Sequence, residues 1–248
     1  MTEEPDRLVL DRPRDLGALI SDSLRIFRRH LGTFLLIALA VVVPVHAIVL
    51  GVGLDKFSGD YDSALRPAEA VVITLVQFLV VGPLVAVMAL HAVREIAEGR
   101  KPRAGASIQA GLDAFSIVFW PVLIAILIEA ATLITIILPF ILIVRWYFVP
   151  QLVVLEKKRG PDALRASWEL TRGLAWRAAG LILVVRLLFE LGGNLISTPV
   201  VAIAQSADSE ALSLAATTLA EVLVAAPLGI FAALLFYDLT TRQAALRR

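Results

Sequence analysis

Residues 161–174 read PDALRASWELTRGL, a polar stretch that lies between two long apolar runs of the chain. Pro161 suits the first turn of a helix and Asp162 suits its positive end, while Gly173 is placed to end it. At about 100° per residue, the charged side chains fall on one narrow arc, and the opposite face is apolar and carries Trp168. This pattern predicts an amphipathic helix that lies along a membrane surface.

The rest of the chain is much more apolar than a soluble domain. The 248 residues are 58% hydrophobic and 18% charged, against roughly 25% charged in soluble domains. Six runs of about 17–26 residues are each long enough to cross a bilayer core of ~30 Å. We therefore predict an all-α integral membrane protein with a single membrane domain, 1–248. The predicted spans are about 31–54, 69–93, 116–138, 139–155, 178–203 and 212–237.

The fourth run, 139–155, is the shortest and is separated from the third only at Leu138-Pro139. The two runs are predicted to form a tight hairpin of two spans. The alternative is a chain with four spans and a re-entrant hairpin.

Two other segments resemble the amphipathic stretch and also run directly into apolar runs. With it, they give predicted interfacial helices at 13–30, 103–115 and 161–173, after a flexible N-terminus at 1–12. When the three copies are overlaid, they suggest a threefold repeat of an interfacial helix, a span outward and a span back. The alternative is that each odd-numbered span needs a basic approach segment.

Lysine and arginine are distributed very unevenly along the chain. Nineteen of the 23 lie in the flanks 1–30, 94–115, 156–177 and 238–248, and only Lys56 and Arg66 lie in the other loops. Positive charge marks the cytoplasmic side of membrane proteins. We therefore expect both termini in the cytoplasm.

Two segments resemble a known family. They are RPRDLGALISDSLRIFRRHLGTF at 12–34 and VRWYFVPQLVVLEKKRGPDALRASWELTRGLAWR at 144–177. They are similar to the membrane domain fused to some bacterial glycerophosphodiester phosphodiesterases, and to free-standing bacterial relatives of that domain. The resemblance implies a membrane module of the bacterial inner membrane. No hydrolase domain and no catalytic residues carry over. The matching residues are Arg145, Pro150, Glu156, Gly160, Ala163, Leu164, Ser167, Trp168, Leu170, Gly173 and Trp176.

Five ionisable residues fall well inside the predicted spans. An isolated charge there costs at least ~2.5–3.5 kcal/mol, so we expect them to pair. Glu129 and Arg145 have depths that allow them to meet within the hairpin, and Arg186 and Glu190 are four apart on one helix face. The pairs either fix helix register or line a pocket or path for an amphiphile. The five residues are Glu129, Arg145, Arg186, Glu190 and Glu221, with His46 and Asn194 as weaker candidates.

Basic and indole side chains of two interfacial helices are candidates for binding an anionic lipid headgroup or a partner protein. The alternative is that these helices only brace the bundle. The candidate residues are Arg25, Arg28, Arg29, Arg165, Trp168 and Arg172.

The sequence offers little for catalysis. It has no cysteine, no nucleotide-binding glycine motif and no HExxH, and its three histidines lie in separate elements. We expect no catalytic residues, metal or cofactor. A net charge of +1 gives no reason to expect nucleic acid as a partner. The predicted function is a non-enzymatic membrane module that binds membrane lipids or a membrane-protein partner, in an accessory or scaffold role in an envelope process. The alternative is a small transporter of an amphiphile that uses the intramembrane charges.

Overall fold

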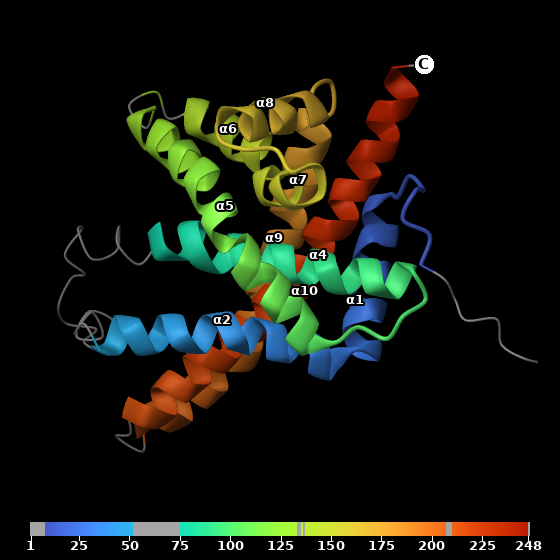
Figure 1. The fold of residues 1–248 in the computed structure, drawn as a ribbon. Coiled ribbons are helices and arrows are strands. Elements are labelled where there is room, and N and C mark those ends of the chain that lie inside the picture. Colours follow the sequence, from blue (N-terminus) through green and yellow to red (C-terminus); the bar gives the residue numbers. More distant parts are fainter. Residues whose placement is uncertain (1–7, 52–74, 133–134, 136, 207–209, 248) are drawn as a thin grey trace, which may run out of the picture.

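A computed structural model describes residues 8–51, 75–132, 135, 137–206 and 210–247. Every named element in these residues is a helix (Figure 1). Six of the described stretches are long and apolar enough to cross a membrane, so the chain is an all-helical multi-pass membrane protein. The elements are α1 (Leu16–Arg29), α2 (Leu31–Gly51), the π-helix η2 (Gln77–Val81), α4 (Gly82–Ala97), α5 (Ala104–Ala131), α6 (Ile137–Trp146), α7 (Val149–Glu156), α8 (Pro161–Leu170), α9 (Ala175–Ser206) and α10 (Glu210–Leu246).

The six candidate spans match the six predicted runs in order, with shifts at their ends. The predicted run 69–93 begins outside the described residues, and its described part continues to Ala97. The predicted flexible segment 1–12 also lies outside them as far as residue 7. The candidate spans are Leu31–Ile48, Gln77–Ala97, Ala104–Ala131, Leu138–Glu156, Ala175–Val200 and Ala215–Leu246.

The predicted interfacial helix at 103–115 is not a separate element. It is the first part of α5, which runs without a break from Ala104 to Ala131. No glycine or proline stands between Gly111 and Pro121, so nothing in the sequence stops the helix near residue 115. By contrast, α1 ends at Arg29 before α2 begins, and α8 is followed by Gly173 at a φ of +78°. The threefold repeat stays a prediction.

The fourth candidate span is two short helices. α6 ends at Trp146 and α7 begins at Val149, with a turn at Tyr147 and Phe148 between them. Pro150 lies in the first turn of α7, where its missing N–H does no harm. Proline has no N–H to donate to the carbonyl four residues before it, which is that of Trp146, and its ring clashes with that carbonyl, so Pro150 accounts for the helix break here.

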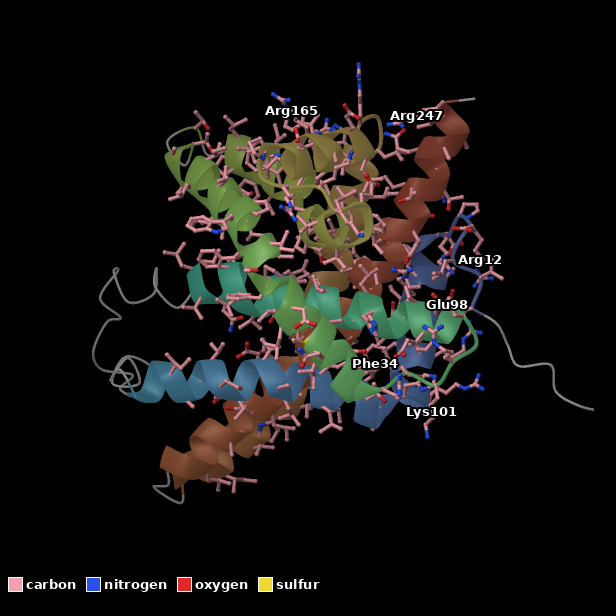
Figure 2. All side chains as sticks on the ribbon, viewed as in Figure 1. Arg12, Phe34, Glu98, Lys101, Arg165 and Arg247 are labelled. Carbon is pink, nitrogen blue, oxygen red and sulfur yellow. The ribbon has the colours of Figure 1, made fainter. Side chains whose placement is uncertain are left out.

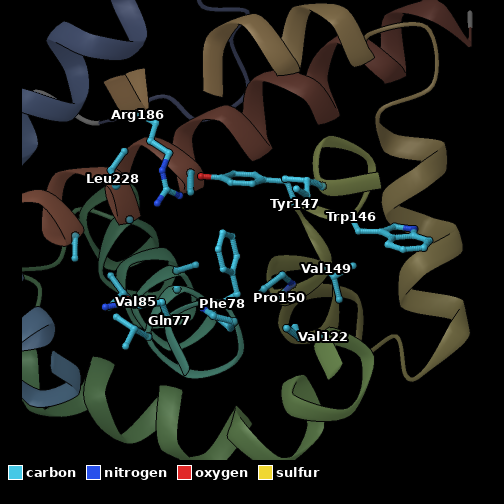
Figure 3. Close-up of a pocket in the computed structure, with 18 of the residues that line it drawn as sticks. Gln77, Phe78, Val85, Val122, Trp146, Tyr147, Val149, Pro150, Arg186 and Leu228 are labelled. Carbon is cyan, nitrogen blue, oxygen red and sulfur yellow. The ribbon is translucent and has the colours of Figure 1, made fainter. Parts of the chain in front are cut away.

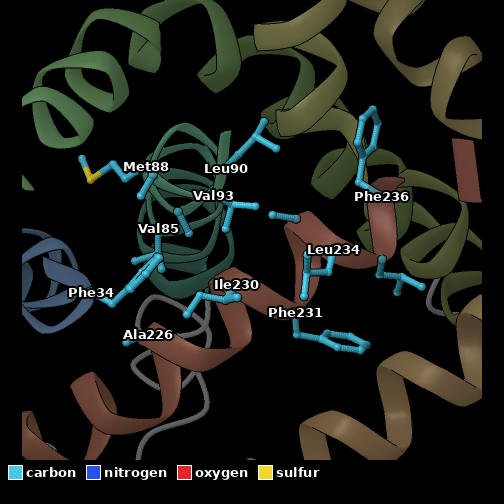
Figure 4. Close-up of a cluster of buried hydrophobic side chains, with 14 of the residues drawn as sticks. Phe34, Val85, Met88, Leu90, Val93, Ala226, Ile230, Phe231, Leu234 and Phe236 are labelled. Carbon is cyan, nitrogen blue, oxygen red and sulfur yellow. The ribbon is translucent and has the colours of Figure 1, made fainter. Parts of the chain in front are cut away.

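α10 is the centre of the bundle. It packs against α1, α2, α4, α8 and α9, and all its side chains from Ile230 to Phe236 are buried. A helix that is apolar all round is expected to be surrounded by other helices. Figure 4 shows Ile230 and Leu234 of α10 facing Val85 and Val93 of α4.

α9 has the opposite character, because large apolar side chains along most of its length are exposed. They include Leu183, Leu187, Leu191 and Leu195, and Leu195 is 79% exposed. Such a surface suits contact with lipid tails, which are as apolar as the side chains themselves. α9 therefore lies at the edge of the bundle, with its other side against α10.

A buried cluster of charged residues, which we term the terminal clamp, joins the N-terminal segment to the end of α10. The side chains of Arg14 and Asp238 are fully buried. The Arg14 backbone N–H donates to Asp238 Oδ1 at 2.6 Å, and Arg14 Nε lies 3.1 Å from Asp22 Oδ2. Arg242 Nε donates to both Asp238 oxygens, at 3.0 and 3.1 Å. Arg177 Nη2 of α9 lies 3.4 Å from Asp238 Oδ2.

The clamp predicts a pH-dependent stability. Burial alone would raise the pKa of Asp22, but hydrogen bonds from Arg12 and Arg14 and the charge of Arg25 hold this pKa below its usual value. The stabilisation is therefore complete above the unfolded pKa of about 3.9 and is lost as the pH falls through the folded pKa. Near pH 7, Asp22→Asn should destabilise the protein by about 3 kcal/mol, measured by thermal unfolding in a mild detergent.

The difference between wild type and Asp22→Asn should shrink as the pH falls below about 4. Asp162→Asn, which changes an exposed acid in the first turn of α8, is the control and should lower the stability by no more than about 1 kcal/mol. A difference for Asp22→Asn that stays constant from pH 7 to pH 3 would contradict this account.

Candidate functional site

A half-open cavity of about 260 Å³ lies between helices of the bundle. Its walls come from η2, α4, α5, the α6–α7 junction, α9 and α10 (Figure 3). Most of the lining is apolar, with Val85, Val122, Ile126 and Leu228 as examples. Since one water takes up about 30 Å³ of liquid, this space is much larger than a packing defect and approaches the size of small-molecule pockets.

Two irregular helices form part of the cavity wall. Before Pro83, the helix widens into the π-helix η2, which presents Gln77 and Phe78 to the cavity. At the break between α6 and α7, Trp146, Tyr147 and the first residues of α7 line the opposite side. Single π turns and interrupted helices occur often at functional sites because they place polar groups where a regular helix cannot.

Four of the five predicted intramembrane charges line this one cavity. They come from α5, α9 and α10. Arg186 Nη2 lies 3.5 Å from Glu190 Oε1, one helical turn along α9, so the predicted pairing of these two residues is present in the structure. The four residues are Glu129, Arg186, Glu190 and Glu221.

Glu221 is held by side chains from two other helices. Its Oε2 lies 2.7 Å from His46 Nε2 of α2, and its Oε1 accepts a hydrogen bond from Gln77 Nε2 at 2.6 Å. The other ring nitrogen of His46 lies 2.7 Å from Thr218 Oγ1. His46 was predicted as a weaker candidate, whereas Gln77 was not predicted, because an uncharged side chain in an apolar run does not stand out in the sequence.

The carboxyl group of Glu129 has a different environment. It lines the cavity, and among the described residues it forms no hydrogen bond or ion pair. Gln151 of α7 is 1% exposed, also lines the cavity, and its Oε1 has no hydrogen-bond partner in the described part of the chain. Buried polar atoms in proteins are usually paired, so Gln151 Oε1 and, in the same lining, the half-buried Glu129 carboxyl group are available to a ligand. The other buried atoms without a partner in the described residues, Arg145 Nε and Arg177 Nε, do not line the cavity.

Arg145 does not meet Glu129, contrary to the expectation for the hairpin. It points to α8, where its guanidinium lies 4.7 Å from the centre of the Trp168 ring, and its Nη1 lies 3.3 Å from Thr171 Oγ1. Ser167 Oγ of α8 donates to the Arg145 carbonyl at 2.6 Å. The register of α6 turns this side chain toward α8, which depth along the helix does not predict. Arg145 and Trp168 therefore dock α8 onto the bundle.

The predicted surface residues remain exposed in the structure. Arg25, Arg28 and Arg29 lie together on the outer face of α1, and Arg25 also pairs with Asp22. Arg165 is 81% exposed and points away from the bundle (Figure 2). Arg172 is exposed beyond the end of α8. These side chains are therefore accessible from outside the bundle.

Hydrogen bonds bring the basic flanks of the chain to one end of the bundle. Arg177 Nη2 donates to the Arg14 carbonyl at 2.5 Å, and Gln243 Nε2 donates to the Glu169 carbonyl at 2.7 Å. Thr33 Oγ1 also donates, at 3.3 Å, to the carbonyl of Pro102, which precedes α5. These contacts join basic flanks that lie far apart in the sequence.

The described residues contain no group of three or more histidine or acidic side chains that could hold a metal ion. No curated protein and no solved structure matches the chain significantly. The glycerophosphodiester phosphodiesterase resemblance finds no link in these comparisons and stays a prediction. One family model does match, over residues 102–241, and its description is a domain of unknown function, DUF7847. This match spans more than half of the sequence and contains α5 to α9 and most of α10, so the chain belongs to the DUF7847 family.

Proposed function

We propose that this protein binds an amphiphile, a lipid or a lipid-like small molecule, in the cavity between α4, α5, α7, α9 and α10, and does not alter it chemically. The observation that carries the proposal is the cavity lining. Most of it is apolar, and its buried Gln151 Oε1 has no partner among the described residues. Ligand pockets typically combine apolar walls with a few placed polar groups.

The location of the cavity also supports an amphiphile. Each of its walls belongs to a helix that can cross a membrane, so a ligand from the bilayer need not pass through water. We further propose that the protein lies in a bacterial cytoplasmic membrane with both termini inside. The support is the gathering of the basic flanks at one end of the bundle and the resemblance of residues 12–34 and 144–177.

We propose that the exposed arginines of α1 and α8 make a second, weaker contact, with the membrane surface or with a partner protein. Each basic residue adds about 1 kcal/mol of attraction to an anionic leaflet. Arg28 and Arg165 are exposed on separate helices, so they provide general attraction to a lipid surface or a partner protein. An accessory role in an envelope process is consistent with this arrangement.

Filling the cavity should abolish ligand binding. Ala86 lines the cavity and Ala130 is exposed on the outside of α5, so Ala86→Phe blocks the space and Ala130→Phe is the matched control. We expect native mass spectrometry of protein extracted gently from its own membrane to show a bound amphiphile. That mass should be lost in Ala86→Phe and kept in Ala130→Phe. Wild-type protein without any retained mass, or the same retained mass in both variants, would contradict the proposal.

Transport of the amphiphile is the second candidate function, and the two irregular helices in the wall favour it. Interrupted helices occur at the substrate sites of transporters, and both η2 and the α6–α7 break line this cavity. In liposomes with the reconstituted protein, an NBD-labelled lipid should cross the bilayer faster than in empty liposomes, as measured by dithionite bleaching. Ala86→Phe should remove the acceleration and Ala130→Phe should keep it. Equal rates with and without protein would exclude transport of this lipid and leave a binding role.

A further inference from the structure

We propose that the polar end of the ligand is an ammonium group, so that the cavity selects a cationic amphiphile such as a long-chain amine. This inference rests on the proposed function and names the ligand class of the same cavity. The charged side chains that line the cavity are one arginine and three glutamates. If all four are ionised, the lining carries a net negative charge.

The pairing of these groups identifies which charge is left for a ligand. Arg186 is within 3.5 Å of Glu190 on the same helix, so its charge is already matched. Glu221 is held by His46 and Gln77. Among the described residues of the lining, Glu129 is therefore the carboxyl group without a partner.

An unpaired carboxyl group inside a membrane protein is costly. A ligand cation is its natural complement. An ammonium group has three hydrogen-bond donors and no acceptor, and the cavity offers it two kinds of unmatched acceptor, the Glu129 carboxyl group and Gln151 Oε1. A carboxylate or phosphate headgroup would instead meet three acids, with the one arginine already paired.

The aromatic lining adds a second reason to expect a cation. The rings of Phe78 and Tyr147 point into this cavity, and Trp146 belongs to its wall (Figure 3). Aromatic faces attract ammonium groups. The Arg186 guanidinium already lies 6.0 Å from the centre of the Phe78 ring. In Figure 3 the Tyr147 hydroxyl points toward Arg186 across the cavity. The apolar tail of the ligand would then lie along Val122 and Leu228.

The test uses brominated chains, which quench tryptophan fluorescence on close approach. Trp146 lines the cavity and Trp176 is 89% exposed on α9. Full-length protein that keeps only Trp146, with the other tryptophans changed to phenylalanine, reports binding in the cavity. Protein that keeps only Trp176 reports general partition into the detergent shell. The three probes are 9,10-dibromo-octadecylamine, 9,10-dibromostearic acid and 9,10-dibromo-octadecanol.

We expect the amine to quench Trp146 saturably and to bind about tenfold more tightly than the acid or the alcohol, the difference that one charged hydrogen bond supplies. Trp176 should show no saturable quenching. Glu129→Gln should remove the preference for the amine and leave binding of the alcohol unchanged. Glu156→Gln, which changes an exposed acid at the end of α7, should keep the preference.

The outcomes separate this inference from the proposed function. If no probe quenches Trp146 saturably, the proposed function itself is wrong. If all three probes bind equally, or the acid binds best, the cavity binds amphiphiles but the ammonium class is wrong. The comparison of the three probes needs no change at Glu129, so it holds even if Glu129→Gln does not fold. A brominated phosphatidylethanolamine, added as a fourth probe, tells a lipid headgroup from a free amine as the source of the ammonium group.

Discussion

The fully buried carboxylate of Asp238 is the group on which the arrangement of the chain's ends depends. A buried carboxylate is tolerated only when it is paired and hydrogen-bonded, and here the donors are the Arg14 N–H and the guanidinium groups of Arg177 and Arg242. These partners come from the N-terminal segment, the start of α9 and the end of α10. The requirement to satisfy one charge therefore holds three separate parts of the chain around the central helix.

The same requirement, that buried polar groups need partners, also bears on the function of the cavity. In the terminal clamp each buried carboxylate has several donors, whereas in the cavity the Glu129 carboxyl group and Gln151 Oε1 have none among the described residues. Most polar groups of the clamp are paired, with Arg177 Nε as the exception among the described residues, whereas the cavity lining has both an amide oxygen and a carboxyl group without a donor. A bound ligand that supplies donors removes this difference. The unmatched groups, rather than the volume of the cavity alone, are what favour a binding function.

The sequence predicted the parts of this structure that depend on local composition. Six apolar runs gave six candidate spans, and charges within them led to four residues that share one cavity. It failed where the outcome depends on helix register or on distant partners. Arg145 turns to α8 because of the rotation of α6, and α5 continues past residue 115 because no residue there stops a helix. The clamp was missed because Arg14 and Asp238 are 224 residues apart, and no local pattern relates them.

A ligand bound in the cavity should be directly visible in the structure of the protein from its own membrane. The most direct measurement is a cryo-electron microscopy map of the protein, transferred from its own membrane into lipid nanodiscs without harsh detergent. We expect elongated density that belongs to no residue, lying between α5, α7 and α10, with its polar end at Glu129. A well-resolved map in which Glu129 and Gln151 pair with other side chains of the chain, and helices close the space between them, would contradict it.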